Sequence, residues 1–385
     1  MNEARIAVVH DWLDTWGGGE NVLAEILRAY PDADLYTLVD FLPDALRPRL
    51  ADKWAHTTFL QRIPGARRHF RSLLPLFPFA IQSLDLSEYS LVISSSHAVA
   101  KGVRTTASQL HVCYCHTPMR YAWDLRDTYL RQRGLATGVA GALANRVLDS
   151  LRDWDRRSSV RVTEFIANSD YVRARIARCY DRTATVIHPP VDTEFFTPAA
   201  HLAPVASRDY YFAASRWVPY KRMDLIAAAF RELPERRLIV AGDGPEAPRV
   251  RAAAAGNVEI LRHVSRERMR ELLRGARAFV FAADEDFGIL PVEAQACGTP
   301  VIAFGRGGAR ETVRDAASSA PTGVFFDTQS PSAIAEAVRR FEALSPAINP
   351  LACRDNALAF STPRFAAQLT AFVDDARRNF GRKRG

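Results

Sequence analysis

The chain has 385 residues, of which 48% are hydrophobic and 24% are charged, a balance typical of folded globular proteins. This composition excludes a disordered or collagen-like chain, and no apolar run approaches the roughly 20 residues that cross a bilayer. Lys and Arg outnumber Asp and Glu by 51 to 43, so we expect an anionic partner: a nucleotide, a nucleic acid or an acidic membrane. The five cysteines include no C-x-x-C pair, and the start of the chain has no secretory pattern; both features favour a cytoplasmic protein.

The first half of the chain alternates short apolar runs with stretches of helical periodicity. A glycine turn, Gly17–Gly19, separates the first run from an amphipathic stretch at 20–30. The candidate strands lie at 5–10, 34–39, 91–97, 111–116, 164–169 and 184–188. Alternation of this kind predicts a mainly parallel sheet with helices on both faces.

The same pattern restarts after a loop rich in Pro and Ala at 189–206, which predicts a second α/β domain. Its candidate strands lie at 210–214, 238–241, 258–261, 278–281, 300–304 and 323–326. The tail from residue 364 is expected to be helical. Ligands of doubly wound sheets bind beyond the carboxyl ends of the strands, so we searched there for chemistry.

Two carboxylates, Glu285 and Glu293, follow the strand at 278–281 of the second domain. The residues between them include Phe287, Gly288, Ile289 and Leu290. If Pro291 begins a helix, the N–H groups of 288–290 lie at its positive end, which suits an anion. Glu293 would then be able to accept hydrogen bonds from vicinal hydroxyls.

Two cations, Arg216 and Lys221, follow the strand at 210–214, and a glycine turn beginning at Gly242 follows the strand at 238–241. Two fixed cations can neutralise a departing diphosphate. Each feature alone is more often a surface charge or a plain turn. Together, in order and each after a strand, they predict a nucleotide-sugar site. The D-x-D triplets at 32–34 and 284–286 fit a metal motif, but such triplets are common by chance.

The spaced motifs S-R-x-x-x-x-K, G-D-G-P, E-x-F-G-x-x-x-x-E and A-x-G-x-P-V-I-A resemble family 4 of the glycosyltransferases over residues 205–330. The resemblance implies a retaining enzyme with the α/β GT-B fold, in which two Rossmann-like domains face a central cleft. We therefore expect an acceptor domain at 1–200, a nucleotide-sugar domain at 201–362, and a helix at 363–385 that packs back on the first domain.

The resemblance also implies roles for the second-domain residues. Arg216 and Lys221 would hold the donor diphosphate, and Glu293 would bind the ribose. Glu285 would contact the donor sugar, and backbone groups near Arg262 and His263 would meet the base. The family works without a metal ion, so we expect no metal cofactor and no effect of EDTA on activity.

In the first domain, Gly18 and Gly19 belong to a glycine loop that lacks the dinucleotide fingerprint, because Val22 stands where its third glycine would be. The resemblance places this loop near donor phosphate and acceptor; a plain glycine turn is the alternative. His116 resembles the cleft histidine that contacts the donor sugar. The sequence from Tyr114 to Asp124 is similar to that of bacterial enzymes that add mannose or related sugars to O-antigen and exopolysaccharide intermediates. It implies GDP-mannose as donor and a lipid-linked saccharide as acceptor.

The segment 53–84 contains five Lys or Arg and no Asp or Glu, beside several aromatic and aliphatic residues. This combination fits either an anionic membrane surface or a core helix with a basic edge. The first reading predicts a cytoplasmic protein held peripherally at the inner face of the cytoplasmic membrane.

Other functions remain open at the level of sequence. A UDP-sugar or GDP-rhamnose could be the donor, a nucleotide-sugar epimerase can share the two-domain fold, and a binding protein without activity is possible. A nucleic-acid partner is not expected, because the basic residues are dispersed and no helix-turn-helix, zinc or base-stacking signature occurs.

Overall fold

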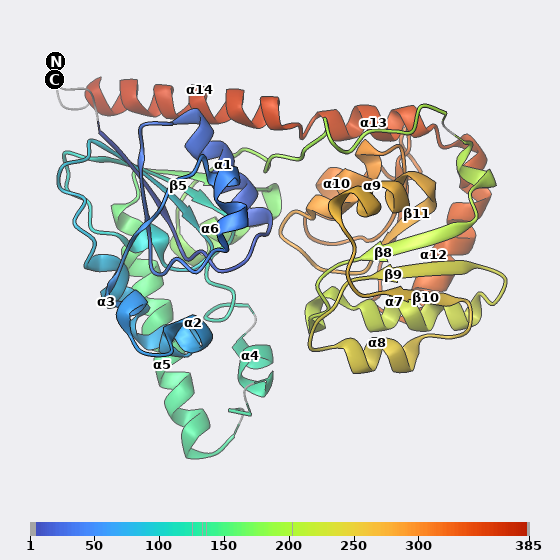
Figure 1. Cartoon of the computed structure of the whole chain (residues 1–385), viewed down its shortest axis with the longest axis horizontal. Coiled ribbons are helices and arrows are strands. Elements are labelled where there is room, and N and C mark those ends of the chain that lie inside the picture. The colour runs from blue at the N-terminus through green and yellow to red at the C-terminus, as the bar shows by residue number, and fades with distance from the viewer. Residues whose placement is uncertain (1–4, 125, 133, 136, 202, 383–385) are drawn as a thin grey trace. The chain divides into compact units, whose positions relative to one another are not determined.

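The computed structural model describes residues 5–124, 126–132, 134–135, 137–201 and 203–382. The chain divides into two compact units (Figure 1). Unit 1 consists of Met1–Pro190 with Phe365–Gly385, and unit 2 consists of Val191–Arg364. The boundaries between the units fall after Pro190 and after Arg364, whereas the expected domain boundaries fell after residues 200 and 362. The outer ends of those domains, 1–4 and 383–385, lie outside the described residues.

Unit 1 is built on a seven-stranded sheet in which every paired strand is parallel, in the order β3-β2-β1-β4-β5-β6-β7. The strands are β1 (Ile6–His10), β2 (Asp34–Thr37), β3 (His56–Thr57), β4 (Leu91–Ser96), β5 (Leu110–Cys115), β6 (Glu164–Ala167) and β7 (Thr185–Val186). All residues of β4 and β5 are buried, as expected for central strands covered on both faces. The register pairs Val8 with Ile93 and with Leu35, which fixes β1 between β4 and β2.

Helices cover both faces of this sheet (Figure 1). The helices of unit 1 are α1 (Gly18–Ala29), α2 (Ala66–His69), α3 (Phe77–Gln82), α4 (Arg126–Gln132), α5 (Gly138–Ser158), α6 (Asp170–Tyr180) and α14 (Thr362–Arg382). Successive residues of β1 enter opposite cores because strand side chains alternate. Val8 packs with residues of α1 and α14, whereas Val9 packs with residues of α3 and α5. The C-terminal helix therefore belongs to the core of unit 1.

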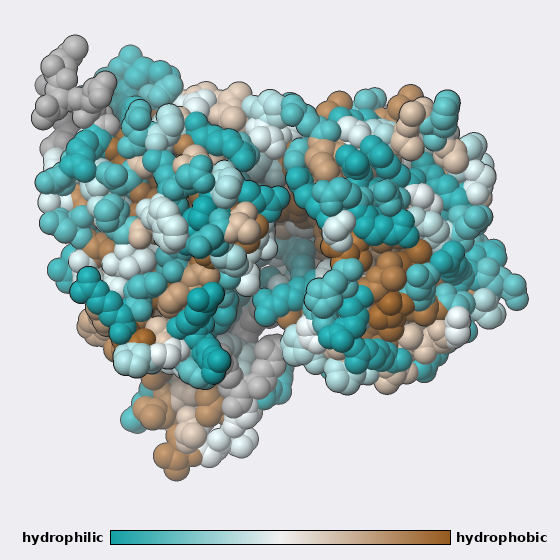
Figure 2. All heavy atoms as spheres, in the orientation of Figure 1, coloured by the Kyte–Doolittle hydropathy of each residue, from teal (hydrophilic) through white to brown (hydrophobic). Residues whose placement is uncertain are grey.

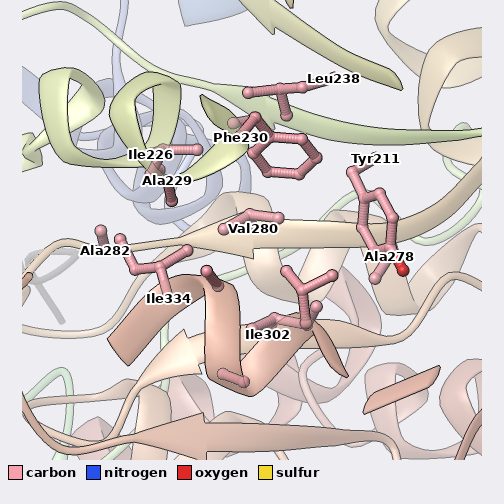
Figure 3. Close-up of a cluster of buried hydrophobic side chains, with 14 of the residues drawn as sticks. Tyr211, Ile226, Ala229, Phe230, Leu238, Ala278, Val280, Ala282, Ile302 and Ile334 are labelled. Carbon is pink, nitrogen blue, oxygen red and sulfur yellow. The ribbon is translucent and has the colours of Figure 1, made fainter. Parts of the chain in front are cut away.

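Unit 2 contains a six-stranded parallel sheet in the order β10-β9-β8-β11-β12-β13. The strands are β8 (Tyr210–Ala214), β9 (Arg237–Ala241), β10 (Val258–Leu261), β11 (Ala276–Phe281), β12 (Val301–Phe304) and β13 (Gly323–Phe326). The helices are α7 (Met223–Ala229), α8 (Ala247–Ala253), α9 (Arg266–Gly275), α10 (Ile289–Ala296), α11 (Ala309–Thr312), α12 (Pro331–Leu344) and α13 (Pro350–Leu358). Figure 3 shows one core face, where Val280 and Ile302 of the sheet meet Ile226 of α7 and Ile334 of α12.

The strands predicted at 210–214, 258–261 and 323–326 have the predicted bounds, and most others differ by one or two residues at an end. Strand β3 was not predicted, because His56 and Thr57 do not belong to an apolar run, whereas the two residues of β7 lie within one. The predicted helix start at Pro291 is wrong. Helix α10 begins at Ile289, because Gly288 takes a φ of +87° and reverses the chain directly before it. Pro291 falls in the first helical turn, where a missing N–H costs no hydrogen bond.

No helix in the described ranges has the length and apolarity needed to cross a membrane.

Candidate active site

The loops that follow β8, β9, β10 and β11, together with α10, carry the candidate residues of unit 2. Because these strands are parallel neighbours, their carboxyl ends lie along one edge of the sheet. Arg216 follows β8, Gly242 follows β9 and Arg262 follows β10. Glu285 follows β11 at the same edge. Arg216, Gly242, Arg262 and Glu285, which the sequence singled out, therefore all lie at this edge.

Lys221 and Glu285 form an ion pair across this edge. Their side chains are only 15% and 17% exposed. The ammonium of Lys221 is thus fixed beside the carboxylate that was expected to contact the donor sugar. Arg216 is exposed and forms no ion pair within the described part of the chain, so its guanidinium is available to a ligand.

The glycine turn after β9 packs directly against the segment that carries Arg216. A Cβ added to Gly242 would lie 1.9 Å from the carbonyl oxygen of Ser215, and Gly242 has a φ of +131°. The Trp217 N–H donates to the carbonyl of Asp243 at 2.9 Å. The glycines of this turn therefore allow two loops to approach closely, and through them the turn positions the cation-bearing loop.

Arg262 does not stand free at the edge, because it forms an ion pair with Asp243. Its Nε donates to the Asp243 carboxylate at 3.0 Å, and this hydrogen bond holds the pKa of Asp243 below its usual range. The neighbouring His263 is exposed. The pair fixes the loop after β10 to the glycine turn, so the backbone near 262 and 263 keeps a defined position.

Glu293 lies in the second turn of α10, beyond the start formed by Gly288. Burial raises the pKa of Glu293 from 4.5 to about 7, with Arg266 lowering it and Asp192 raising it. The N–H groups of Ile289 and Leu290 lie in the first turn, which leaves them without partners inside the helix. Phe287 is buried and packs edge-on against Phe360, 5.5 Å between ring centroids. Phe287 is thus a core residue that anchors the loop.

Sequence reasoning missed the loop Gly305–Gly308, which follows β12 at this edge. The Gly308 N–H donates to the carbonyl of Glu285 at 2.9 Å. A Cβ added to Gly307 would lie 2.2 Å from the same carbonyl oxygen, and one added to Gly308 would lie 2.3 Å from Cα of Phe287. This loop therefore packs against the backbone of Glu285 and holds it in position. The signal was present in the sequence as three glycines directly after a strand.

In unit 1, the carboxyl edge of the sheet carries His116 and the glycine loop. Gly18 and Gly19 are the first two residues of α1. A Cβ added to Gly19 would lie 3.8 Å from Nε2 of His116 and 3.7 Å from Cε1 of His10. The absence of a side chain at Gly19 thus leaves room beside two imidazole rings.

His116 is held by Ser95, whose Oγ lies 2.8 Å from its Nε2 and 3.1 Å from Nδ1 of His10. Burial, with His97 and His10 nearby, lowers the pKa of His116 to about 3. The His116 ring is therefore neutral at physiological pH and can exchange hydrogen bonds with a hydroxyl. Glu20 lies 3.6 Å from Nε2 of His10.

Sequence reasoning also missed Asp11 and His97, which follow β1 and β4. Asp11 is fully buried, and its carboxylate lies 3.0 Å from Nδ1 of His97. Burial alone would raise the pKa of Asp11, but His97 and the adjacent backbone N–H groups hold it well below its usual range. The rule that located the other candidates, polar residues directly after strands, would have found both.

No group of three or more His, Cys, Asp or Glu side chains in the described ranges is arranged to hold a metal ion. Asp34 of the first D-x-D triplet lies at the amino end of β2, where it accepts from the Tyr89 hydroxyl at 2.7 Å. This triplet therefore lies away from the carboxyl edge.

Two family profiles match the chain. Residues 201–358 match the glycosyl transferases group 1, and residues 16–195 match Glycosyltransferase Family 4. The chain belongs to the family 4, group 1 glycosyltransferases. Together the two profiles match most of both units of the chain.

Curated relatives match the chain over part of its length. The D-inositol 3-phosphate glycosyltransferase of Geodermatophilus obscurus is 39% identical over 138 residues, which is 34% of this chain and 30% of the relative. The protein of that name from Streptomyces coelicolor is 30% identical over 151 residues, 36% of this chain and 32% of the relative. The matched stretch spans about a third of these relatives.

Solved structures match the whole fold at low identity. HepE of Anabaena, in complex with UDP, is 18% identical with a TM-score of 0.69 and covers 96% of this chain and 100% of that chain. Sucrose-phosphate synthase of Thermosynechococcus elongatus is 19% identical with a TM-score of 0.70, covering 98% and 100%. These matches confirm the predicted GT-B fold.

Proposed function

We propose that this glycosyltransferase is a retaining enzyme that moves a hexose from a nucleotide sugar to an acceptor hydroxyl. The observation that carries the proposal is the Lys221–Glu285 ion pair at the carboxyl edge of unit 2, with the exposed Arg216 in the same loop after β8. Two cations there suit a diphosphate, and a carboxylate fixed beside them suits the attached sugar. Glu293 is available to the ribose hydroxyls, and the backbone near 262 and 263 to the base.

In the proposed reaction the bond between the sugar C1 and the diphosphate oxygen breaks. A new bond forms between C1 and the acceptor oxygen on the same face, and the acceptor proton passes to the leaving diphosphate. Lys221 and Arg216 stabilise the negative charge that develops on that diphosphate. His116, whose ring is neutral, and Glu285 orient the hexose through its hydroxyls. The two cations take the charge-neutralising role, so the proposal includes no metal.

The donor that we propose is GDP-mannose, and the acceptor is a lipid-linked saccharide of bacterial polysaccharide assembly. Support comes from the string between Tyr114 and Asp124, which is similar to enzymes of that pathway. A UDP-sugar is the second candidate donor, because HepE was solved in complex with UDP. GDP-rhamnose is a third.

A thermal-shift panel of GDP-, UDP- and ADP-sugars tests the donor, since a ligand that binds the folded state raises the melting temperature by mass action. We expect GDP-mannose to give the largest shift. A larger shift with a UDP-sugar would replace GDP-mannose as the donor, and no shift with any nucleotide sugar would contradict the proposed function.

A nucleotide-sugar epimerase is the alternative enzyme. An epimerase converts its donor in the absence of an acceptor, whereas the proposed transferase requires one. Incubation with the preferred donor alone, followed by analysis of the sugar, separates the two. We expect no new nucleotide sugar.

We also propose a peripheral contact with an anionic membrane through unit 1. Phe79 and Trp54 are 70% and 64% exposed, close in sequence to the exposed cations Arg67 and Arg68. Val139, in the first turn of α5, is 89% exposed, and Figure 2 shows apolar surface at the projecting end of unit 1. Other aromatic residues of the 53–84 segment, such as Phe70 and Phe77, are core residues instead.

Flotation with vesicles tests this contact. At low salt we expect more binding to vesicles that contain anionic lipid than to neutral vesicles, and less at high salt, because surface charges are screened. Equal flotation with both vesicle types would remove the membrane from the proposal.

A further inference from the structure

Asp11 organises the loop that follows β4 in unit 1. Its carboxylate accepts hydrogen bonds from four successive backbone N–H groups. The donors are His97 at 2.6 Å, Ala98 at 3.0 Å, Val99 at 2.6 Å and Ala100 at 2.7 Å. Nδ1 of His97 is a fifth partner. Both oxygens of Asp11 are thus occupied, so Asp11 is a fixed buried anion that positions its surroundings and does not itself reach a substrate.

The ring of His97 is held on two sides. Nδ1 faces Asp11, and the ring of Trp12 packs edge-on at 4.6 Å between centroids with an interplanar angle of 83°. The side chain is nevertheless 33% exposed, and its Nε2 has no hydrogen-bond partner in the part of the chain that the structure describes. A proton on Nδ1 is fixed by Asp11, so Nε2 is the atom that His97 presents outward.

His97 differs from the two histidines nearest to it. The rings of His10 and His116 lie 6.3 and 6.4 Å from it, and both are bonded to the hydroxyl of Ser95. His10 is fully buried, and His116 is neutral at physiological pH. His97 is paired with the fully buried Asp11, whereas His10 lies 3.6 Å from the part-buried Glu20. Burial would lower the pKa of His97, but Asp11 raises it above its usual value, which favours the protonated ring.

The other charged side chains near this ring have partners of their own. Glu20 lies beside His10 and accepts from the N–H of Gly17 at 2.8 Å, and Arg71 forms an ion pair with Asp14. With Nδ1 held by Asp11, Nε2 is the nitrogen of His97 that can meet a ligand, and in the protonated ring that Asp11 favours it is a donor.

We propose that Nε2–H of His97 binds an oxyanion of the acceptor, a phosphate or a carboxylate group, with Asp11 as the positioning residue. The inference rests on the proposed function and on the acceptor domain expected at residues 1–200. A charge-assisted hydrogen bond from an imidazolium to an oxyanion is about twice as strong as one between neutral groups. Such a hydrogen bond from His97 would make the protein bind acidic acceptors more tightly than neutral ones.

Two substitutions separate the ligand contact from the structural one. His97→Asn places an amide N–H near the position of Nδ1, so it keeps a donor to Asp11 and loses the outward nitrogen. His97→Gln places an uncharged N–H near the position of Nε2. We expect His97→Gln to retain part of the anion binding and His97→Asn to bind the anion much more weakly.

The experiment titrates the full chain with three probes while the ring ¹⁵N resonances of His97 are followed by NMR. The probes are D-inositol 3-phosphate for a phosphate, D-glucuronate for a carboxylate, and inositol as the neutral control. The resonances are assigned by their absence from His97→Asn. We expect one charged probe to shift the Nε2 resonance saturably, and the dissociation constant to rise at least about tenfold in His97→Asn at an unchanged melting temperature. The probe that binds identifies the anion.

Three results would overturn the inference: no shift with either charged probe, an equal shift with inositol, or unchanged affinity in His97→Asn. If His97→Asn does not fold, the wild-type titration and His97→Gln still decide the question. A chain that binds a nucleotide sugar and neither anion contradicts this inference alone. A chain that binds no nucleotide sugar contradicts the proposed function.

Discussion

At the scale of single residues, Lys221 is the cation that the structure holds most firmly at the proposed donor site. Its ion pair with Glu285 fixes the ammonium before a donor arrives, so little reorganisation is needed when charge develops on the leaving diphosphate. We predict that Lys221→Ala lowers turnover by about 10²-fold or more, the usual loss when one charge-stabilising donor is removed.

Release of nucleoside diphosphate measures this effect. Arg249→Ala is the matched control, because Arg249 is an exposed cation of unit 2 that also pairs with a glutamate, Glu246. Turnover of Lys221→Ala equal to that of the control would remove Lys221 from the mechanism.

Glu293 supplies a prediction on pH. Its pKa is raised by burial from 4.5 to about 7, so between these two values the folded chain binds a proton that the unfolded chain releases. The contribution of Glu293 to stability is therefore complete below about pH 4.5 and is lost as the pH rises through 7. From pH 5 to 8, we predict that the free energy of unfolding of wild type falls relative to Glu293→Gln by about 3 kcal/mol at most.

Urea unfolding at a series of pH values measures the difference. Glu271→Gln, which replaces an exposed glutamate of the same unit, should follow the wild-type profile. Parallel profiles for wild type and Glu293→Gln would show that the carboxyl is ionised throughout this range.

At the scale of elements, the loops at the edge of unit 2 depend on close backbone contact. Gly242→Ala would force a Cβ to 1.9 Å from the carbonyl of Ser215 and place an alanine at a φ of +131°. We predict a loss of stability of about 1–3 kcal/mol from the backbone strain alone, together with reduced turnover, because the loop that carries Arg216 must move.

Gly256→Ala is the control, since no atom lies within 4 Å of a Cβ built there. Thermal unfolding and turnover are measured for both variants. If Gly242→Ala matches Gly256→Ala in both, the turn after β9 does not position the cation-bearing loop.

At the scale of the whole molecule, the chain returns from unit 2 to complete the core of unit 1. Leu369 of α14 is fully buried in the core that also contains Val8 and residues of α1. We predict that Leu369→Ala costs about 2–5 kcal/mol in the unfolding transition of unit 1. Leu358→Ala, in α13, should cost much less because Leu358 is 42% exposed.

Denaturant unfolding followed by a probe in each unit measures both variants. An effect of Leu369→Ala no larger than that of Leu358→Ala would mean that α14 does not contribute to the stability of unit 1.

Local patterns were enough to predict the two α/β sheets and the edge on which the candidate residues lie. Buried strands such as β8 could be predicted from their apolar runs. The rule that ligands bind after strands identified Glu285 and Lys221 as candidates. Contacts between distant segments could not be predicted in this way. Asp11 and the N–H of His97 are 86 residues apart, and they meet only because β1 and β4 are neighbours in the sheet. Likewise, the burial that raises the pKa of Glu293 depends on packing that no local pattern contains.

The central claim is that the carboxyl edge of unit 2 binds the donor diphosphate. A crystal structure with the nucleotide sugar that gives the largest thermal shift tests it most directly. We predict diphosphate oxygens in contact with Nζ of Lys221 and the guanidinium of Arg216, and ribose hydroxyls on Glu293. A diphosphate bound away from these residues, for example on His97 of unit 1, would contradict the account.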